Sequence, residues 1–248
     1  MSIEQLISVG GVLGTFITAF LVYRTLKEMK TQRTNSYRPE VVATKIEFNA
    51  SSTMEGLPVP TEWKEKGNED DETKNLSMNR IQIELLNLGF AAAKNINIKW
   101  SYGYEAIINE IQEVCYKNSI PIVIELQEGG TITIDFNGKS KHYFNIESDL
   151  SGYHDYIAPT SSSHSPLFIQ FPYSVMILYS ILIYMAVKTD SEKLMDALAE
   201  REIELKVDYL DLGDKMHFKS FNCITSLSTV STRPDDKKMS YSGLIEFK

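Results

Sequence analysis

An uncharged segment near the amino terminus constrains this chain more than any other feature. Residues 6–23 read LISVGGVLGTFITAFLVY, eighteen residues without an acid or a base. In an α-helix such a segment extends about 27 Å, close to the thickness of the hydrocarbon core of a bilayer. The pattern predicts a transmembrane helix over 6–23, preceded by a short tail over 1–5. The alternative is a buried helix that opens a soluble domain.

The charges that flank this segment predict its orientation. Only Glu4 precedes it, whereas a cluster of bases follows it. A secretory signal has the opposite order, so cleavage is not expected. Cytoplasmic flanks are enriched in Lys and Arg, so we expect a single-pass membrane protein with the amino terminus outside and the body in the cytoplasm. We predict a basic juxtamembrane helix over 24–38, with bases that contact lipid headgroups: Arg24, Lys27, Lys30 and Arg33.

Two glycines in the apolar segment suggest helix association. Gly10 and Gly14 form a G-x-x-x-G step. Small residues at this spacing let two helices approach closely in a bilayer, so self-association is one expectation. The other is that lipid simply tolerates these glycines, since glycine is more frequent in transmembrane helices than in soluble ones.

The composition of the whole chain is ordinary for a folded protein. The 248 residues are 43% hydrophobic and 23% charged, and the net charge is −8. This charge argues against a protein that binds duplex nucleic acid. Cys115 and Cys223 lie far apart. Two cysteines give neither a disulfide framework nor a metal motif, so both are expected to be buried and free.

Residues 39–248 show mainly the two-residue periodicity of strands. Arg38-Pro39 ends the helix, because the residue before proline avoids the α region. About eight short strands and few helices predict an antiparallel β-sandwich with one or two inserted helices. The predicted strands are 41–48, 80–86, 96–100, 121–125, 131–136, 142–146, 204–209, 217–222 and 240–247, and the predicted helix is 104–116. Residues 49–77 are expected to form a mobile acidic loop and 149–166 another loop.

A second uncharged segment, residues 167–187, allows two interpretations. It is long enough to be a second membrane span. Alternatively, residues 167–171 form a strand and Pro172 opens a buried helix, since proline is accepted in the first helical turn. The second interpretation is preferred, because the tyrosines and serines of this segment give it a polar side. A span would also separate the strands after it from the rest of the sheet.

Chemical motifs are weak throughout the sequence. No phosphate loop, dinucleotide fingerprint, zinc motif or nucleophile elbow is present. His154, Asp155 and His164 with the serines 161–163 contain the residue types of a hydrolase, but in no known spacing. Asp208, Asp211 and Asp214 gather at one turn and are interpreted as turn chemistry. We therefore predict no catalytic residue, no metal site and no cofactor, and the sequence identifies no cofactor-binding residue.

Two stretches carry a resemblance to a group of bacterial proteins. NLGFAAAKNINIKW at 87–100 and LKVDYLDLGDKMHFKSF at 205–221 resemble small membrane-anchored proteins with a cytosolic β-sandwich domain. Some of these are membrane effectors of anti-phage systems. The resemblance implies an inner-membrane protein whose soluble domain senses a ligand or partner.

These patterns together predict a membrane-tethered, non-enzymatic binding or sensing protein. Its expected partners are the membrane, a second copy or a partner protein, and a small-molecule or nucleotide ligand. One alternative is an oligomerising effector that permeabilises the membrane, which requires 167–187 to be a span. A less favoured alternative is a membrane-bound hydrolase that uses the loop from His154 to His164.

Overall fold

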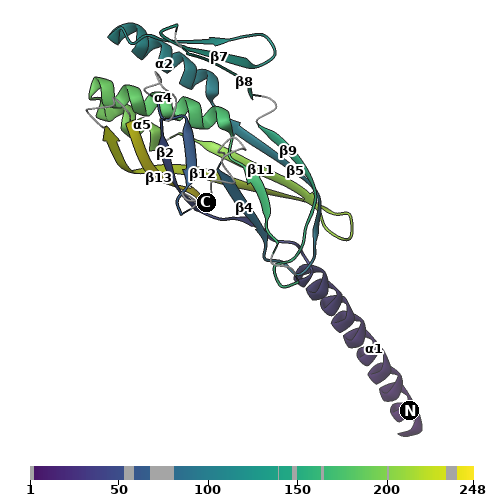
Figure 1. The fold of residues 1–248 in the computed structure, drawn as a ribbon. Helices are drawn as coiled ribbons and strands as arrows, with labels where there is room; N and C mark the ends of the chain where they lie inside the picture. Colours follow the sequence, from purple (N-terminus) through teal and green to yellow (C-terminus); the bar gives the residue numbers. More distant parts are fainter. Residues whose placement is uncertain are drawn as a thin grey trace.

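The computed structural model describes residues 3–52, 59–67, 81–138, 140–146, 150–162, 165–199, 201–232 and 239–248. The fold is mainly β, with a long amino-terminal helix that projects from one end of the body (Figure 1). The elements are α1 (Ile3–Ser36), β1 (Val41–Ala43), β2 (Ile46–Ser51), β3 (Glu62–Glu65), β4 (Gln82–Asn87), β5 (Ala93–Tyr102), α2 (Tyr104–Asn118), β6 (Ile122–Leu126), β7 (Thr131–Phe136), β8 (Ser140–Asn145), β9 (Ser151–Ile157), β10 (Leu167–Gln170), α4 (Tyr173–Thr189), α5 (Glu192–Ala199), β11 (Ile203–Leu210), β12 (Met216–Thr232) and β13 (Met239–Phe247).

The main sheet has seven strands in the order β3-β2-β13-β12-β11-β5-β9. Every pair in it is antiparallel, which confirms the predicted sheet type. Helix α4 and a second sheet, β1-β4-β10, share one hydrophobic core with it. Phe171, between β10 and α4, joins these layers, because its ring lies 6.2 Å from that of Trp63 and 5.4 Å from that of Trp100.

The second apolar segment is a strand followed by a buried helix, so the preferred interpretation is confirmed. Pro172 stands immediately before α4, and twelve residues of the helix are buried. Ser180 anchors it to the main sheet: its hydroxyl accepts a hydrogen bond from Trp63 Nε1 at 3.0 Å and lies 2.7 Å from the Tyr241 hydroxyl. The alternative of a second membrane span over this segment is wrong.

The predicted helix over 104–116 and the strands after it are also confirmed. Helix α2 buries the four residues that share its apolar face: Ile107, Ile108, Ile111 and Cys115. Strands β6, β7 and β8 form a separate antiparallel sheet beside it. Both cysteines are free and buried, as predicted, and burial raises the pKa of the Cys223 thiol to about 12.

Two predictions about strands are wrong. The segment 41–48 is two strands, because the chain leaves the small sheet after Ala43 and enters the main sheet at Ile46. Residues 149–166, expected to be a loop, contain the edge strand β9, which pairs with β5.

The predicted loop 49–77 and the helix count also need correction. Strand β2 extends to Ser51, and β3 lies inside the supposed loop with Trp63 fully buried. The acidic residues 69–72 lie outside the described residues. Helix α5 was not predicted, so the body contains three inserted helices in its described part rather than one or two.

Candidate membrane anchor and ligand pocket

The described apolar side chains of α1 are exposed on all sides. Phe20, Leu21 and Val22 are successive, so they point in directions about 100° apart, and each is more than half exposed. Leu13, Phe16 and Ile17 are equally exposed. Within the part of the chain that the structure describes, no helix reaches the combined length and hydropathy of a membrane span.

The structure places the predicted association and headgroup residues along this one helix. Gly10 and Gly14 both lie in α1, and a Cβ built at Gly14 would have no heavy atom within 4 Å. Arg24 forms an exposed ion pair with Glu28 at 3.3 Å. Lys27 and Lys30 are exposed in the same helix. Arg33 also belongs to α1, but its side chain lies outside the described ones.

The junction between α1 and the body is held by buried polar contacts. The Tyr209 hydroxyl donates to the carbonyl oxygen of Pro39 at 3.2 Å. Asn87 Oδ1 accepts from the backbone N–H groups of Glu40 and Gly89, both at 3.0 Å. These bonds fix the chain where it leaves the helix. Asn87 is fully buried, and its role could not be predicted from the sequence, because asparagine close to a glycine is typical of an ordinary turn.

The described residues of the two weaker candidate sites do not assemble into a catalytic or metal centre. His154 and Asp155 are neighbours on strand β9, so their side chains point to opposite faces. Ser162 donates to the carbonyl oxygen of Pro159 at 3.0 Å, and His164 lies outside the described residues.

The aspartates near Gly213 form a hydrogen-bonded turn. Asp211 Oδ1 accepts from the N–H groups of Gly213 and Lys215, and Oδ2 lies 2.9 Å from Nε2 of His217. Asp214 pairs with Lys94 at 2.9 Å. The hydrogen bond from His217 is the main cause that lowers the pKa of Asp211. Among the described residues, no group of three His, Cys, Asp or Glu side chains could hold a metal ion.

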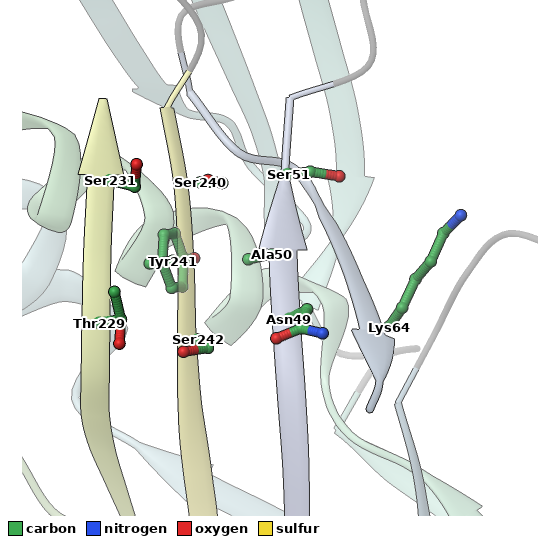
Figure 2. A pocket seen from close by; sticks show the side chains of 9 residues that line it. All are labelled: Asn49, Ala50, Ser51, Lys64, Thr229, Ser231, Ser240, Tyr241 and Ser242. Carbon is green, nitrogen blue, oxygen red and sulfur yellow. The ribbon is translucent and has the colours of Figure 1, made fainter. Parts of the chain in front are cut away.

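A shallow polar groove of about 400 Å³ lies across strands β2, β13 and β12 (Figure 2). Its lining is mostly small hydroxyl and amide side chains of these strands, with Lys64 at one side. Hydroxyls on the outer face of a sheet are readily satisfied by water. We therefore assign no ligand to this groove.

A second pocket, here called the α2 pocket, has a buried polar lining. It measures about 560 Å³ and lies between the end of β5, the start of α2, the middle of α4 and the start of β11. Figure 1 shows α2 and α4 at the end of the body away from α1, whereas β5 and β11 extend from there toward α1. The lining residues are Ser101, Tyr102, Gly103, Ala106, Ile107, Tyr179, Arg201, Glu202, Ile203 and Glu204.

Two buried donors in the α2 pocket lack an acceptor among the residues that the structure describes. Tyr179 is 1% exposed, and its hydroxyl has no hydrogen-bond partner among the described residues. Nε of Arg201 is likewise buried without a partner there, although the same guanidinium is ion-paired with Glu110. Burial raises the pKa of Tyr179, and the positive charge of Arg201 opposes this rise only in part. A buried polar group without a partner costs about 1–3 kcal/mol, so both atoms would gain stability from an added acceptor.

Sequence reasoning missed this pocket. Tyr179 lies in an apolar segment and Arg201 stands alone between a helix and a strand. Their positions, 22 apart in sequence, carry no motif that would connect them. Comparisons of the chain with family models, with curated proteins and with solved structures gave no match.

Proposed function

We propose that this chain is a membrane-tethered, non-enzymatic binding protein of the bacterial inner membrane, with the body in the cytoplasm. The observation that carries the proposal is helix α1, whose described apolar side chains are exposed around its circumference. In water this surface would be costly, at about 25 cal/mol for each Å² of apolar area. In a bilayer the same surface is solvated by lipid.

The sequence next to the apolar segment supports this assignment. The uncharged segment 6–23 is followed directly by Arg24 and Lys27, where a cytoplasmic headgroup layer favours positive charge. The body then provides the binding function through the α2 pocket, at the end remote from α1. Residues 87–100 and 205–221 resemble small bacterial membrane-anchored proteins, some of which are anti-phage effectors, so infection assays with phage are the natural search for a biological role.

Cell fractionation tests the anchor. The full chain is expected in the membrane fraction after lysis, resistant to high salt and alkaline carbonate, and released by detergent. A variant with Phe16→Lys and Phe20→Lys places two charges in the segment and is expected to move to the supernatant. Lys193→Ala, on α5 of the body, is the control that should stay in the membrane. A wild-type chain found in the supernatant without detergent would refute the anchor.

The orientation needs a separate measurement. A protease added to intact spheroplasts is expected to leave the body uncut, and to degrade it only after the membrane is opened. Cleavage of the body in intact spheroplasts would place it in the periplasm and contradict the proposed orientation.

A further inference from the structure

The charges around the α2 pocket determine which ligands it favours. The charge of Arg201 is already balanced by Glu110, and that of Glu204 by Lys206 at 2.9 Å. Glu202 is exposed, lines the pocket and forms no ion pair with another described residue. The described lining of the pocket therefore has no surplus positive charge, and a carboxylate stands at its exposed side. This arrangement disfavours a ligand with net negative charge, such as inorganic phosphate.

The buried side of the pocket needs an acceptor. The guanidinium of Arg201 can only donate, and the Tyr179 hydroxyl has no partner among the described residues. Gly103 and Ala106, at the start of α2, also line the pocket, and no side-chain hydrogen bond caps this end of the helix. A carbonyl or carboxylate oxygen of the ligand would satisfy these donors. The exposed carboxylate of Glu202 would in turn accept from an N–H group.

We propose that the α2 pocket binds an amino-acid-type ligand, a small molecule that combines a carboxylate or carbonyl oxygen with an amino group and has no net negative charge. Its oxygen lies against Tyr179 and Arg201, and its amino group faces Glu202. This inference rests on the proposed binding function and names the ligand class of that site. The volume of about 560 Å³ accommodates a free amino acid or the end of a short peptide.

Two conservative variants test the contacts. Tyr179→Phe removes only the hydroxyl, and Arg201→Lys keeps the positive charge towards Glu110 but removes the planar N–H donor. The matched control is Tyr209→Phe, which loses a buried tyrosine hydroxyl at the opposite end of β11. The full chain in detergent is heated with each of the twenty L-amino acids at 10 mM, and with acetate and inorganic phosphate at the same concentration.

The expected result is a concentration-dependent rise in the Tm with one or a few amino acids. Calorimetric titration of those amino acids should give an affinity at least tenfold weaker in Tyr179→Phe and in Arg201→Lys, and unchanged in Tyr209→Phe. No rise with any amino acid would overturn the proposal. So would equal stabilisation by acetate or phosphate, or wild-type affinity in Tyr179→Phe.

The result of the ligand-binding test can be distinguished from the result of the membrane-anchor test. Binding in detergent does not depend on where the chain resides in the cell, so a chain that fractionates as soluble but binds an amino acid refutes the anchor alone. A chain that stays in the membrane and binds none of the probes refutes the ligand class alone.

Discussion

Two buried tyrosines of this chain differ in what surrounds their hydroxyl groups. The Tyr241 hydroxyl lies 2.7 Å from that of Ser180, which also accepts from Trp63. The Tyr179 hydroxyl, one residue before Ser180 on α4, has no partner among the described residues. Because both rings are buried to a similar degree, substitution by phenylalanine isolates the effect of the hydroxyl group.

The two substitutions are expected to have different effects on stability. Tyr241→Phe should lower the free energy of unfolding by about 1–2 kcal/mol, because it breaks a buried hydrogen bond. Tyr179→Phe should leave it unchanged or raise it slightly, since no bond is lost and an unsatisfied hydroxyl is removed. Urea denaturation of the ligand-free chain in detergent measures both. A large loss in Tyr179→Phe would show that the hydroxyl has a partner that the structure does not show.

Gly89 is required because two backbone segments approach each other closely at this position. A Cβ at this position would lie 2.2 Å from the carbonyl oxygen of Arg38 and 2.6 Å from the backbone nitrogen of Glu40. Both neighbours are backbone atoms that cannot rotate away. Gly89→Ala is therefore expected to destabilise the body by about 3 kcal/mol or more. Gly152→Ala is the control, because the nearest atom to its Cβ is 3.8 Å away, and its effect should stay within about 0.5 kcal/mol.

Among the elements, α1 and α4 show how far hydropathy alone predicts structure. Both come from uncharged segments, but α4 contains Ser174 and Ser180, and both serines are buried. This polar content correctly predicted a core helix. The periodicity of Ile81, Ile83 and Leu85 likewise predicted the buried face of β4. Alternation could not predict the break at Thr44, because a strand that changes sheets keeps its period.

The buried position of α4 predicts strong effects of truncation. Ile181 is fully buried, so Ile181→Ala should cost about 2–5 kcal/mol. Val187, near the end of the same helix, is 38% exposed, and Val187→Ala should cost less than 1 kcal/mol. Thermal or urea unfolding of the two variants measures the difference. Equal and small effects would contradict the placement of α4 in the core.

The turn between β11 and β12 predicts a pH dependence. The pKa of Asp211 is lowered in the folded chain, first by the hydrogen bond with His217. A carboxyl group whose pKa is lowered on folding stabilises the protein above its unfolded pKa, near 4, and this contribution is lost as the pH falls through the folded value. Asp211→Asn should therefore reduce the loss of stability below about pH 4. Denaturation between pH 2.5 and 6 tests this, and parallel curves for the two proteins would refute it.

At the scale of the whole molecule, α1 is expected to determine the association state. Since a Cβ at Gly14 would meet nothing within 4 Å in one chain, the monomer itself does not need a glycine there. Gly14→Leu should leave the unfolding of the body unchanged but weaken self-association in a bilayer, as measured by energy transfer between labelled chains in vesicles. Gly11→Leu has the same open surroundings and is the control. If Gly14→Leu, Gly11→Leu and the wild-type chain associate equally, the G-x-x-x-G step has no role in self-association.

The run of strand β11 has a mechanical consequence. Ile203, at its beginning, lines the α2 pocket, and Tyr209, near its end, holds Pro39 beside α1. A strand that is hydrogen-bonded on both sides resists stretching. A displacement at one end is therefore expected to move the other end, unless the strand deforms between them. The pairing of β11 with β5 is irregular between Asp208 and Leu210, next to Tyr209. We therefore expect a displacement of Ile203 at the pocket to change the tilt of α1, and spin-label distances across the junction would measure this change.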